Sequence, residues 1–336
     1  MANLRDVAEQ AGVHTSTASR ALDPDHSQMV GAKTRARVVQ AAEELGYRAN
    51  QVARGLRKGR TGAIGVVIAD MGNPFLPPII RGMAGSLREL GMIALVAETE
   101  DDPGVLEKAL LDLLDRKVDA IITTAVHLTD RPLITEINKT IPVVLAVRTF
   151  LDGSFHAVTH DDALGGAMAA RHLCSLGHTR LAELSGPDDV SSFVGRSRGA
   201  KSAIDESDQP VTHRVAVGTH PTTAEGHRLM TEILEQGFVP TAVFAHNDLM
   251  AVGAIDALGQ AGLSCPGDVS VVGYNDSPMT DRLNPPLTTV RFASYEIGSR
   301  AAKLAGSLLD DPDQPVASYS LTPDFVERAS TARLAD

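Results

Sequence analysis

The sequence predicts a small all-α helix-turn-helix headpiece followed by an α/β unit of two doubly wound lobes. Its 336 residues, 43% of them hydrophobic, are enough for two or three compact units. In the first fifty residues, short segments carry apolar residues at helical spacing. From Gly62 onward, apolar runs alternate with amphipathic helical segments. About nine such runs, from AIGVVIA to TTVRF, are too many for one small sheet. We therefore expect two parallel sheets covered by helices.

The headpiece is predicted from its helix start and stop signals. Asn3 is expected to cap a first helix whose apolar residues lie on one face, and Gly12 is expected to end that helix. A second short helix is expected over residues 15–22, and two helices joined by a glycine-containing turn form a helix-turn-helix. A third helix is expected over residues 32–45, closed by Gly46 in a left-handed cap.

The charge is distributed unevenly between the two parts. The whole chain carries a net charge of -11, which by itself argues against a nucleic-acid partner. Residues 1–60 contain ten Lys and Arg against six Asp and Glu, a balance of +4, so the remainder carries -15. A basic head on an acidic body suits a protein whose head alone approaches phosphate.

The string DVAEQAGVHTSTASRAL, followed by AKTRARVVQAAEELGYRANQVARGL, resembles the headpiece of the lactose and galactose repressor family over some fifty residues. The resemblance implies that the second helix enters the major groove of DNA and that Thr15, Ser16 and Arg20 contact base edges. Arginine forms the commonest specific pair, with guanine. Ser19 and Lys33 are expected at phosphates, which set register and carry no sequence information.

The segment NQVARGL, residues 50–56, resembles the hinge helix of the same family. The resemblance implies that Asn50 caps this helix, that Ala53 faces the second copy and that Leu56 wedges into the minor groove. So short a helix is marginal alone. We therefore expect it to fold on DNA. There, the free-energy cost of unstacking the bases around an apolar wedge is offset by the larger contact surface of the bent DNA.

The resemblance continues through the rest of the chain in blocks such as IGVVIADMGNPF, AHNDLMAVGAI and DVSVVGYNDSP. It implies the fold of periplasmic sugar-binding proteins, with three crossovers between lobes near residues 160, 292 and 322. The expected division is a headpiece over 1–48, a hinge over 49–61 and a sensor over 62–336. Its N-lobe is expected over 62–160 and 293–321, and its C-lobe over 161–292 and 322–330.

Polar and aromatic residues at strand ends are candidates for a ligand pocket between the lobes, because ligands bind at the carboxyl ends of parallel strands. The candidates are Asp70, Asn73, Phe75, Arg148, Asp161, Phe193, Arg196, Asn247 and Asn275. Many members of the family carry Asp where this chain has Asn275 and Val147, and the chain has no Trp. These departures disfavour a large stacked hexose and leave a pentose, polyol, nucleoside or small anion open as the ligand.

Other classes of function receive little support. No HExxH, CxxC, P-loop or GxSxG motif occurs, so no catalytic residue, metal or cofactor is expected. The polar start and the lack of long apolar runs indicate a cytoplasmic protein with no membrane partner. We expect a homodimeric, ligand-controlled repressor on a palindromic operator. The alternative is a periplasmic-type sugar-binding or transport protein, which residues 1–60 disfavour.

Overall fold

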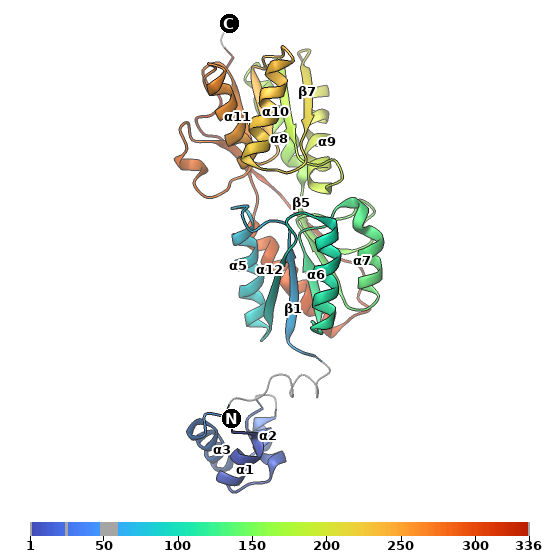
Figure 1. Ribbon diagram of the computed structural model, residues 1–336, viewed down its shortest axis with the longest axis vertical. Coiled ribbons are helices and arrows are strands. Elements are labelled where there is room, and N and C mark those ends of the chain that lie inside the picture. The colour runs from blue at the N-terminus through green and yellow to red at the C-terminus, as the bar shows by residue number, and fades with distance from the viewer. Residues whose placement is uncertain (1, 24–25, 48–59, 335–336) are drawn as a thin grey trace. The chain divides into compact units, whose positions relative to one another are not determined.

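The computed structural model describes residues 2–23, 26–47 and 60–334 (Figure 1). The chain forms two compact units, Met1–Thr61 and Gly62–Asp336. The expected hinge residues Asn50, Ala53 and Leu56 lie outside the described residues.

The described residues of the first unit form short helices: α1 (Leu4–Gln10), α2 (Thr15–Ala21), the 3-10 turn η1 (Ser27–Met29) and α3 (Ala32–Glu44). The Asn3 carboxamide oxygen accepts hydrogen bonds from the first turn of α1, and the Asp6 carboxylate accepts one from the Asn3 N–H across 2.8 Å. A capping arrangement of this kind stabilises a helix start by about 1 kcal/mol.

Helices α1, α2 and α3 enclose one small apolar core. Val7 from α1, Ala18 from α2 and Val38 from α3 are fully buried at its centre. Gly12 and Gly46 have φ values of +64° and +59°, the left-handed conformation in which glycine is least strained. The predicted helix-turn-helix and its third helix are confirmed.

The second unit contains two six-stranded sheets. The first sheet has the order β11-β5-β4-β3-β1-β2 and is parallel throughout. Its strands are β1 (Ala63–Ile68), β2 (Ile93–Glu98), β3 (Ala120–Thr123), β4 (Val143–Ala146), β5 (His156–His160) and β11 (Ser318–Leu321). Buried β-branched and aliphatic residues dominate the central strands, as a sheet covered on both faces requires.

The second sheet has the order β12-β10-β9-β8-β6-β7, and only β12 runs antiparallel to its neighbour. Its strands are β6 (Arg180–Ser185), β7 (Thr212–Val217), β8 (Ala242–Ala245), β9 (Ser270–Asn275), β10 (Thr288–Arg291) and β12 (Asp324–Val326). The predicted two-lobed α/β fold is therefore confirmed.

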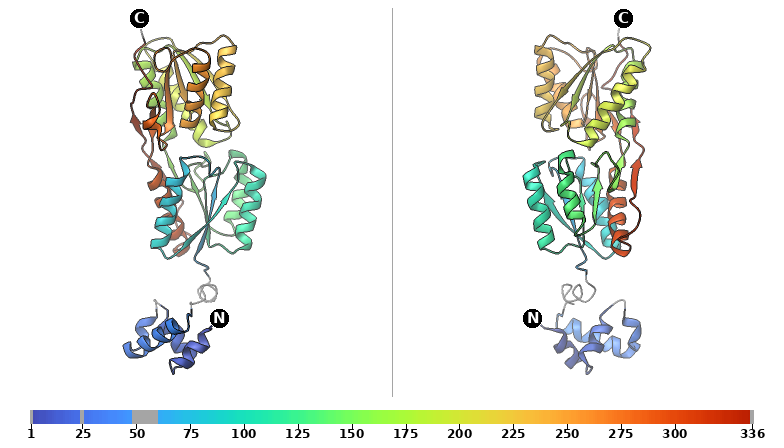
Figure 2. Two further views of the ribbon diagram at one scale, coloured as in Figure 1. Left: turned by 60° about the vertical axis from the view of Figure 1, so that its left-hand side comes forward. Right: turned by 90° about the vertical axis from the view of Figure 1, so that its right-hand side faces the viewer.

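Helices cover both faces of each sheet (Figure 2). In the N-lobe these are α5 (Leu76–Glu89), α6 (Pro103–Asp115), α7 (Arg131–Asn138) and α12 (Ser294–Asp310). In the C-lobe they are α8 (Asp162–Ser175), α9 (Ser191–Asp205), α10 (Thr223–Glu235) and α11 (Asp248–Gln260). Among the described residues, no helix is both long and apolar enough to cross a membrane.

Helices α5 and α12 approach closely at a glycine. A Cβ added to Gly298 of α12 would lie 1.9 Å from the Ile79 carbonyl oxygen of α5. The backbones of α5 and α12 are thus in direct contact at this point, which only a residue without a side chain permits.

The chain passes between the sheets three times: between β5 and α8, between β10 and α12, and between β11 and β12. One apolar cluster is continuous across these crossings. Phe292, in the second crossing, stacks on His160 with ring centroids 3.9 Å apart and contacts Phe75 at 4.4 Å. The two lobes therefore share a core on one side of the molecule.

Strands β5, β11 and β12 were not among the apolar runs that the sequence indicates. The segment HAVTH of β5 carries a histidine at each end, β11 is mostly exposed, and β12 has three residues. Each lies at or beside a crossover, where its neighbours in the sheet come from distant parts of the chain. Local periodicity cannot report such pairing.

Candidate functional site

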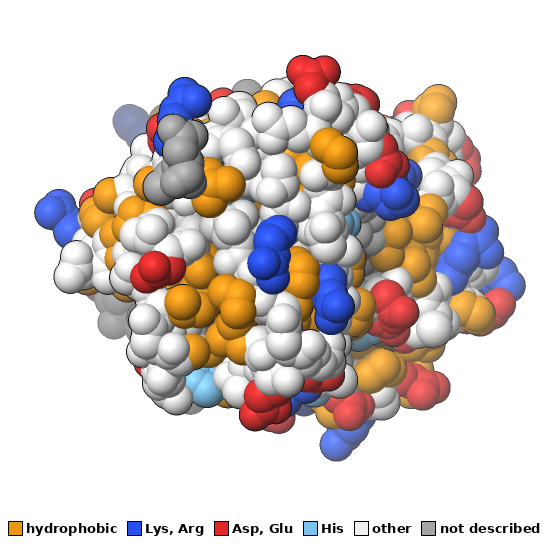
Figure 3. Space-filling view, turned by 90° about the horizontal axis from the view of Figure 1, so that it is seen from above, with side chains coloured by type: hydrophobic (Ala, Val, Ile, Leu, Met, Phe, Trp, Pro, Cys, Tyr) orange, Lys and Arg blue, Asp and Glu red, His pale blue; other side chains and the backbone are white. Residues whose placement is uncertain are grey.

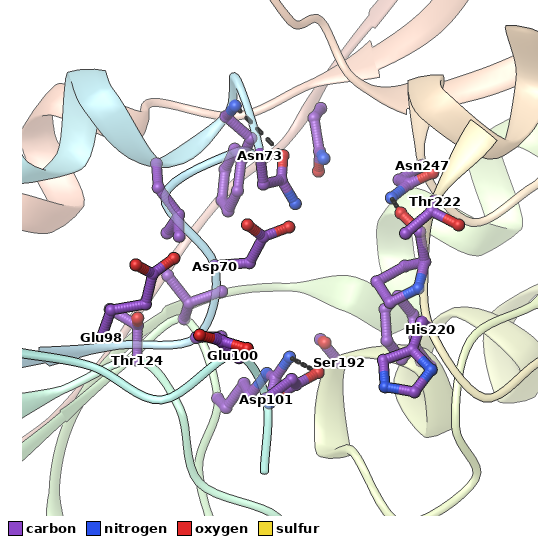
Figure 4. A pocket seen from close by; sticks show the side chains of 18 of the residues that line it. Asp70, Asn73, Glu98, Glu100, Asp101, Thr124, Ser192, His220, Thr222 and Asn247 are labelled. Atoms are coloured by element: carbon purple, nitrogen blue, oxygen red, sulfur yellow. Dashed lines mark hydrogen bonds and ion pairs between the residues drawn. The ribbon is translucent and has the colours of Figure 1, made fainter. Parts of the chain in front are cut away.

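A cavity of about 420 Å³ lies between the lobes, at the carboxyl ends of both sheets. In Figure 4, Asp70 and Asn73 follow β1 on one side, and Asn247 follows β8 on the other. Eight of the nine predicted residues line this cavity: Asp70, Asn73, Phe75, Arg148, Phe193, Arg196, Asn247 and Asn275. We call it the cleft.

Asp161 is the predicted residue that does not line the cleft. Its carboxylate accepts a hydrogen bond from the Leu164 N–H across 2.9 Å and caps α8. It faces a separate hollow of about 260 Å³. Because the side chain turns back to its own helix, the structure places Asp161 apart from the other candidates.

Arg148 and Asp101 form a bidentate ion pair at the edge of the cleft. The Arg148 Nη1 and Nη2 atoms donate to the two Asp101 carboxylate oxygens across 2.6 and 3.0 Å. His127 Nε2 lies 3.1 Å from the same carboxylate. Burial opposes ionisation of Asp101, but these two partners lower its pKa below its ordinary value. Arg148 is thus already matched by a buried carboxylate.

The same histidine connects the two lobes. His127 Nδ1 lies 3.0 Å from an Asp189 carboxylate oxygen, and the Leu128 N–H donates to the Asp189 carbonyl across 2.7 Å. The hydrogen bond to Asp101 is the largest of the effects that shift the pKa of His127, and the pKa is raised. His127 therefore links a carboxylate from each lobe.

Arg196 is also held by a carboxylate. Its Nε donates to Asp162 Oδ1 across 2.8 Å, and its Nη1 donates to the His246 carbonyl. The guanidinium lies 3.8 Å from the Tyr274 ring centroid, within cation–π distance. Burial raises the pKa of Asp162 to about 7, against the attraction of Arg196.

Two of the asparagines that line the cleft, Asn247 and Asn275, differ in the hydrogen bonds of their side chains. Asn247 caps α11: its Oδ1 accepts from the Met250 N–H across 2.7 Å, and its Nδ2 donates to the Pro221 carbonyl. Asn275 has a left-handed φ of +113°, and its buried Oδ1 has no hydrogen-bond partner among the described residues. A buried acceptor without a partner costs free energy unless a ligand or water satisfies it.

Several cleft residues were not predicted from the sequence: Leu76, Glu98, Glu100, Asp101, Thr124, Ser192, His220, Pro221 and Thr222. The acids belong to the run ETEDD, which directly follows the second predicted strand. The strand-end rule that selected Asp70 could have selected them. Val147, noted as a departure from the family, also lines the cleft, with a φ of +69°.

In the first unit, α2 presents polar side chains at its surface. His14 caps the helix, with Nδ1 2.8 Å from the Ser16 hydroxyl oxygen. Arg20 is exposed, and its side chain forms no hydrogen bond or ion pair with any described residue. Thr15 and Ser19 are half-buried, and Lys33 is exposed in the first turn of α3.

On the face shown in Figure 3, Lys and Arg are interleaved with Asp and Glu among the visible described side chains. An exposed helix-turn-helix in one unit and a two-lobed cleft in the other define a class: DNA-binding transcriptional regulators with a small-molecule sensor.

Comparison with known proteins gives the family. The profile described as "Bacterial regulatory proteins, lacI family" matches residues 3–50, and that of a periplasmic binding protein-like domain matches residues 170–331. The ribose operon repressor of Escherichia coli K12 is 32% identical over 332 residues, which cover 98% of this chain and all of that protein. The chain belongs to the lacI family of bacterial regulatory proteins.

Solved structures agree with this assignment. A lac repressor dimer bound to operator and the anti-inducer ONPF is similar with a TM-score of 0.86, 27% identity and coverage of 98% and 99% of the two chains. A LacI family regulator from Enterococcus faecium with bound ribose has a TM-score of 0.71 and 29% identity over 81% of this chain and all of that one. The chain is thus a transcriptional regulator and not an enzyme, and the reading as a transport protein is not supported.

Proposed function

We propose that the protein is a homodimeric repressor whose affinity for a near-palindromic operator changes when a sugar, polyol or nucleoside binds in the cleft. The observation that carries the proposal is the convergence of eight side chains predicted from the sequence, from both lobes, on one cavity. Its size suits a small molecule. Similar proteins are solved with operator and with ribose.

On the DNA side, Arg20, Thr15 and Ser16 contact base edges in the major groove. Ser19 and Lys33 contact phosphates. The exposure of Arg20 and its lack of a described partner support this role, because a guanidinium that is already paired would have to release its partner to bind guanine.

The proposed division is a headpiece over 1–48, a hinge over 49–61 and a sensor over 62–336. In the hinge, Asn50, Ala53 and Leu56 form a helix that folds in the minor groove when two copies meet on the operator. Such a regulator acts where its DNA is, so we place it in the cytoplasm. Two headpieces imply half-sites about one helical turn apart.

Two measurements on the full chain test this proposal. Selection from a random DNA pool is expected to recover one palindromic consensus, and recovery of unrelated sequences contradicts operator recognition. Thermal melting in the presence of sugars, polyols and nucleosides is expected to show a higher Tm for the effector, because a ligand that binds only the folded state stabilises it. The same effector must then change operator retention on a gel. A ligand that raises Tm without changing retention contradicts effector control.

A further inference from the structure

The charges of the cleft are unbalanced. Two arginines line it, and each already has a carboxylate partner: Arg148 has Asp101 and Arg196 has Asp162. Both guanidinium groups are therefore committed before a ligand arrives. An anionic ligand would have to displace a buried carboxylate from one of them, and separating a buried ion pair is costly.

Three further carboxylates line the same cavity: Asp70, Glu98 and Glu100. None of them forms an ion pair with any described residue. Asp70 accepts a hydrogen bond from the Gly72 N–H and Glu98 accepts one from the Met71 N–H, which leaves their charges without a counter-ion. Even if Asp162 is half protonated near pH 7, the cleft carries a net negative charge.

The carboxylates lie on one side of the cavity, with Thr124 beside them, whereas Asn247, Thr222 and His220 lie on the opposite side (Figure 4). They do not form a metal site, since no group of three metal-binding side chains occurs in the described parts of the chain. Charges spread in this way suit an extended organic cation.

Two buried oxygen atoms in the cleft lack partners as well. Asn275 Oδ1 has none, and Asn275 is only 6% exposed. Thr124 Oγ1 has none either, with Thr124 2% exposed. The amide oxygen can only accept, so a ligand group that satisfies it is a hydrogen-bond donor. The cleft therefore offers hydrogen-bond acceptors and negative charge to a ligand that carries donors.

We infer that the effector is a cationic polyhydroxylated molecule, one that carries an ammonium group together with hydroxyl donors, and that phosphorylated or carboxylated sugars are excluded. The inference rests on the proposed effector cleft. The ammonium binds among Asp70, Glu98 and Glu100, while hydroxyl groups donate to Asn275 Oδ1 and reach Thr124.

The test compares an ammonium, a neutral and an anionic ligand within each of two sets that share a six-carbon skeleton. One set is D-glucamine, D-sorbitol and D-gluconate, and the other is D-glucosamine, N-acetyl-D-glucosamine and D-glucose 6-phosphate. Titration calorimetry of the full chain at pH 7 is expected to show the ammonium member of at least one set binding roughly tenfold or more tightly than the neutral member, because opposite charges attract strongly in a partly desolvated cleft. The anionic member is expected to bind more weakly than both.

A matched pair of variants locates the effect. Asp70→Asn removes one charge but keeps the oxygen that accepts from the Gly72 N–H, and it is expected to reduce the preference for ammonium about threefold or more. Glu107→Gln removes the same charge from the exposed surface of α6, outside the cleft, and is expected to leave the preference unchanged.

Each outcome is decisive. If a neutral or anionic member binds as tightly as the ammonium member, or if Asp70→Asn behaves like Glu107→Gln, the inference fails and the effector cleft stands. If no member of either set binds at millimolar concentration, both the inference and the assignment of the cleft to sugars and polyols fail.

Discussion

Arg148 and Asp101 form a bidentate pair at the edge of the cleft, although β3 and β1 lie between the strands that precede them. Arg148 follows β4 and Asp101 follows β2. Each side chain is only 8% exposed, so the pair lies in a desolvated environment where the loss of one partner leaves the other without compensation. The pair therefore fixes two loops that carry cleft residues.

Replacing Arg148 is expected to destabilise the sensor strongly. Arg148→Ala should lower the free energy of unfolding by about 3–5 kcal/mol, since it leaves the Asp101 charge buried. Urea unfolding followed by circular dichroism measures the change. Arg171→Ala is the matched control: its pair with Glu206 is about half exposed and should contribute at most about 1 kcal/mol. Equal losses in the two variants contradict the prediction.

The link between the lobes through His127 is expected to weaken at alkaline pH. The pKa of His127 is raised by the hydrogen bonds to Asp101 and Asp189, against burial and the repulsion of Arg148. A raised pKa means that the folded state holds the proton more tightly. Its stabilising effect is complete below the ordinary pKa of histidine, about 6.5, and is lost as pH rises through the raised value.

Unfolding measured between pH 5.5 and 9 in the wild type and in His127→Gln checks this sign. The stability difference between the two should be largest at the acidic end of the range and should shrink as pH rises. A difference that stays constant with pH rules out a protonated link.

Cleft residues can be predicted from the sequence where a polar side chain directly follows a predicted strand. Asp70 and Asn247 each follow an apolar run directly, and the carboxyl end of a parallel strand identifies them. The pair between Arg148 and Asp101 was not predicted from the sequence. The ETEDD run offers four acids, and which of them turns inward depends on loop geometry that local pattern does not encode.

His127 illustrates the same limit. Its partners, Asp101 and Asp189, are 26 and 62 residues away along the chain, and Asp189 belongs to the other lobe. Only the folded topology brings them together. Asp161 shows the converse, since it directly follows β5 but caps α8 and does not line the cleft. A helix cap and a ligand contact call for the same residue types.

The contact between α5 and α12 is expected to tolerate no side chain at Gly298. Gly298→Ala places a methyl group against the Ile79 carbonyl, which forces the helices apart at a cost of about 1–3 kcal/mol or more. Gly259→Ala is the control, because no atom lies within 4 Å of its added Cβ in α11. That change should stabilise by up to about 1 kcal/mol. Thermal melting of both variants separates crowding from helix propensity.

Asn275 is expected to lower the stability of the free protein and to strengthen binding of the effector. Its left-handed φ and unpartnered Oδ1 both cost free energy in the absence of ligand. Asn275→Gly removes both and should raise the stability of the free protein by about 1 kcal/mol. The same change removes an acceptor from the cleft, so the rise in Tm produced by the effector should be smaller than in the wild type. A less stable variant with an undiminished ligand response contradicts this view.

Replacing Arg20 and replacing Lys33 are expected to weaken DNA binding in different ways. Arg20 lies on exposed α2, and Arg20→Ala should cost about 1–3 kcal/mol per half-site on the selected operator while relaxing preference at one base position. Lys33 lies in the first turn of α3, and Lys33→Ala should weaken binding to all sequences alike and reduce the slope of affinity against salt concentration. Affinities for operator and random DNA between 50 and 200 mM salt distinguish the two cases. If Lys33→Ala changes base preference and Arg20→Ala changes only the salt slope, the proposed orientation of the headpiece is wrong.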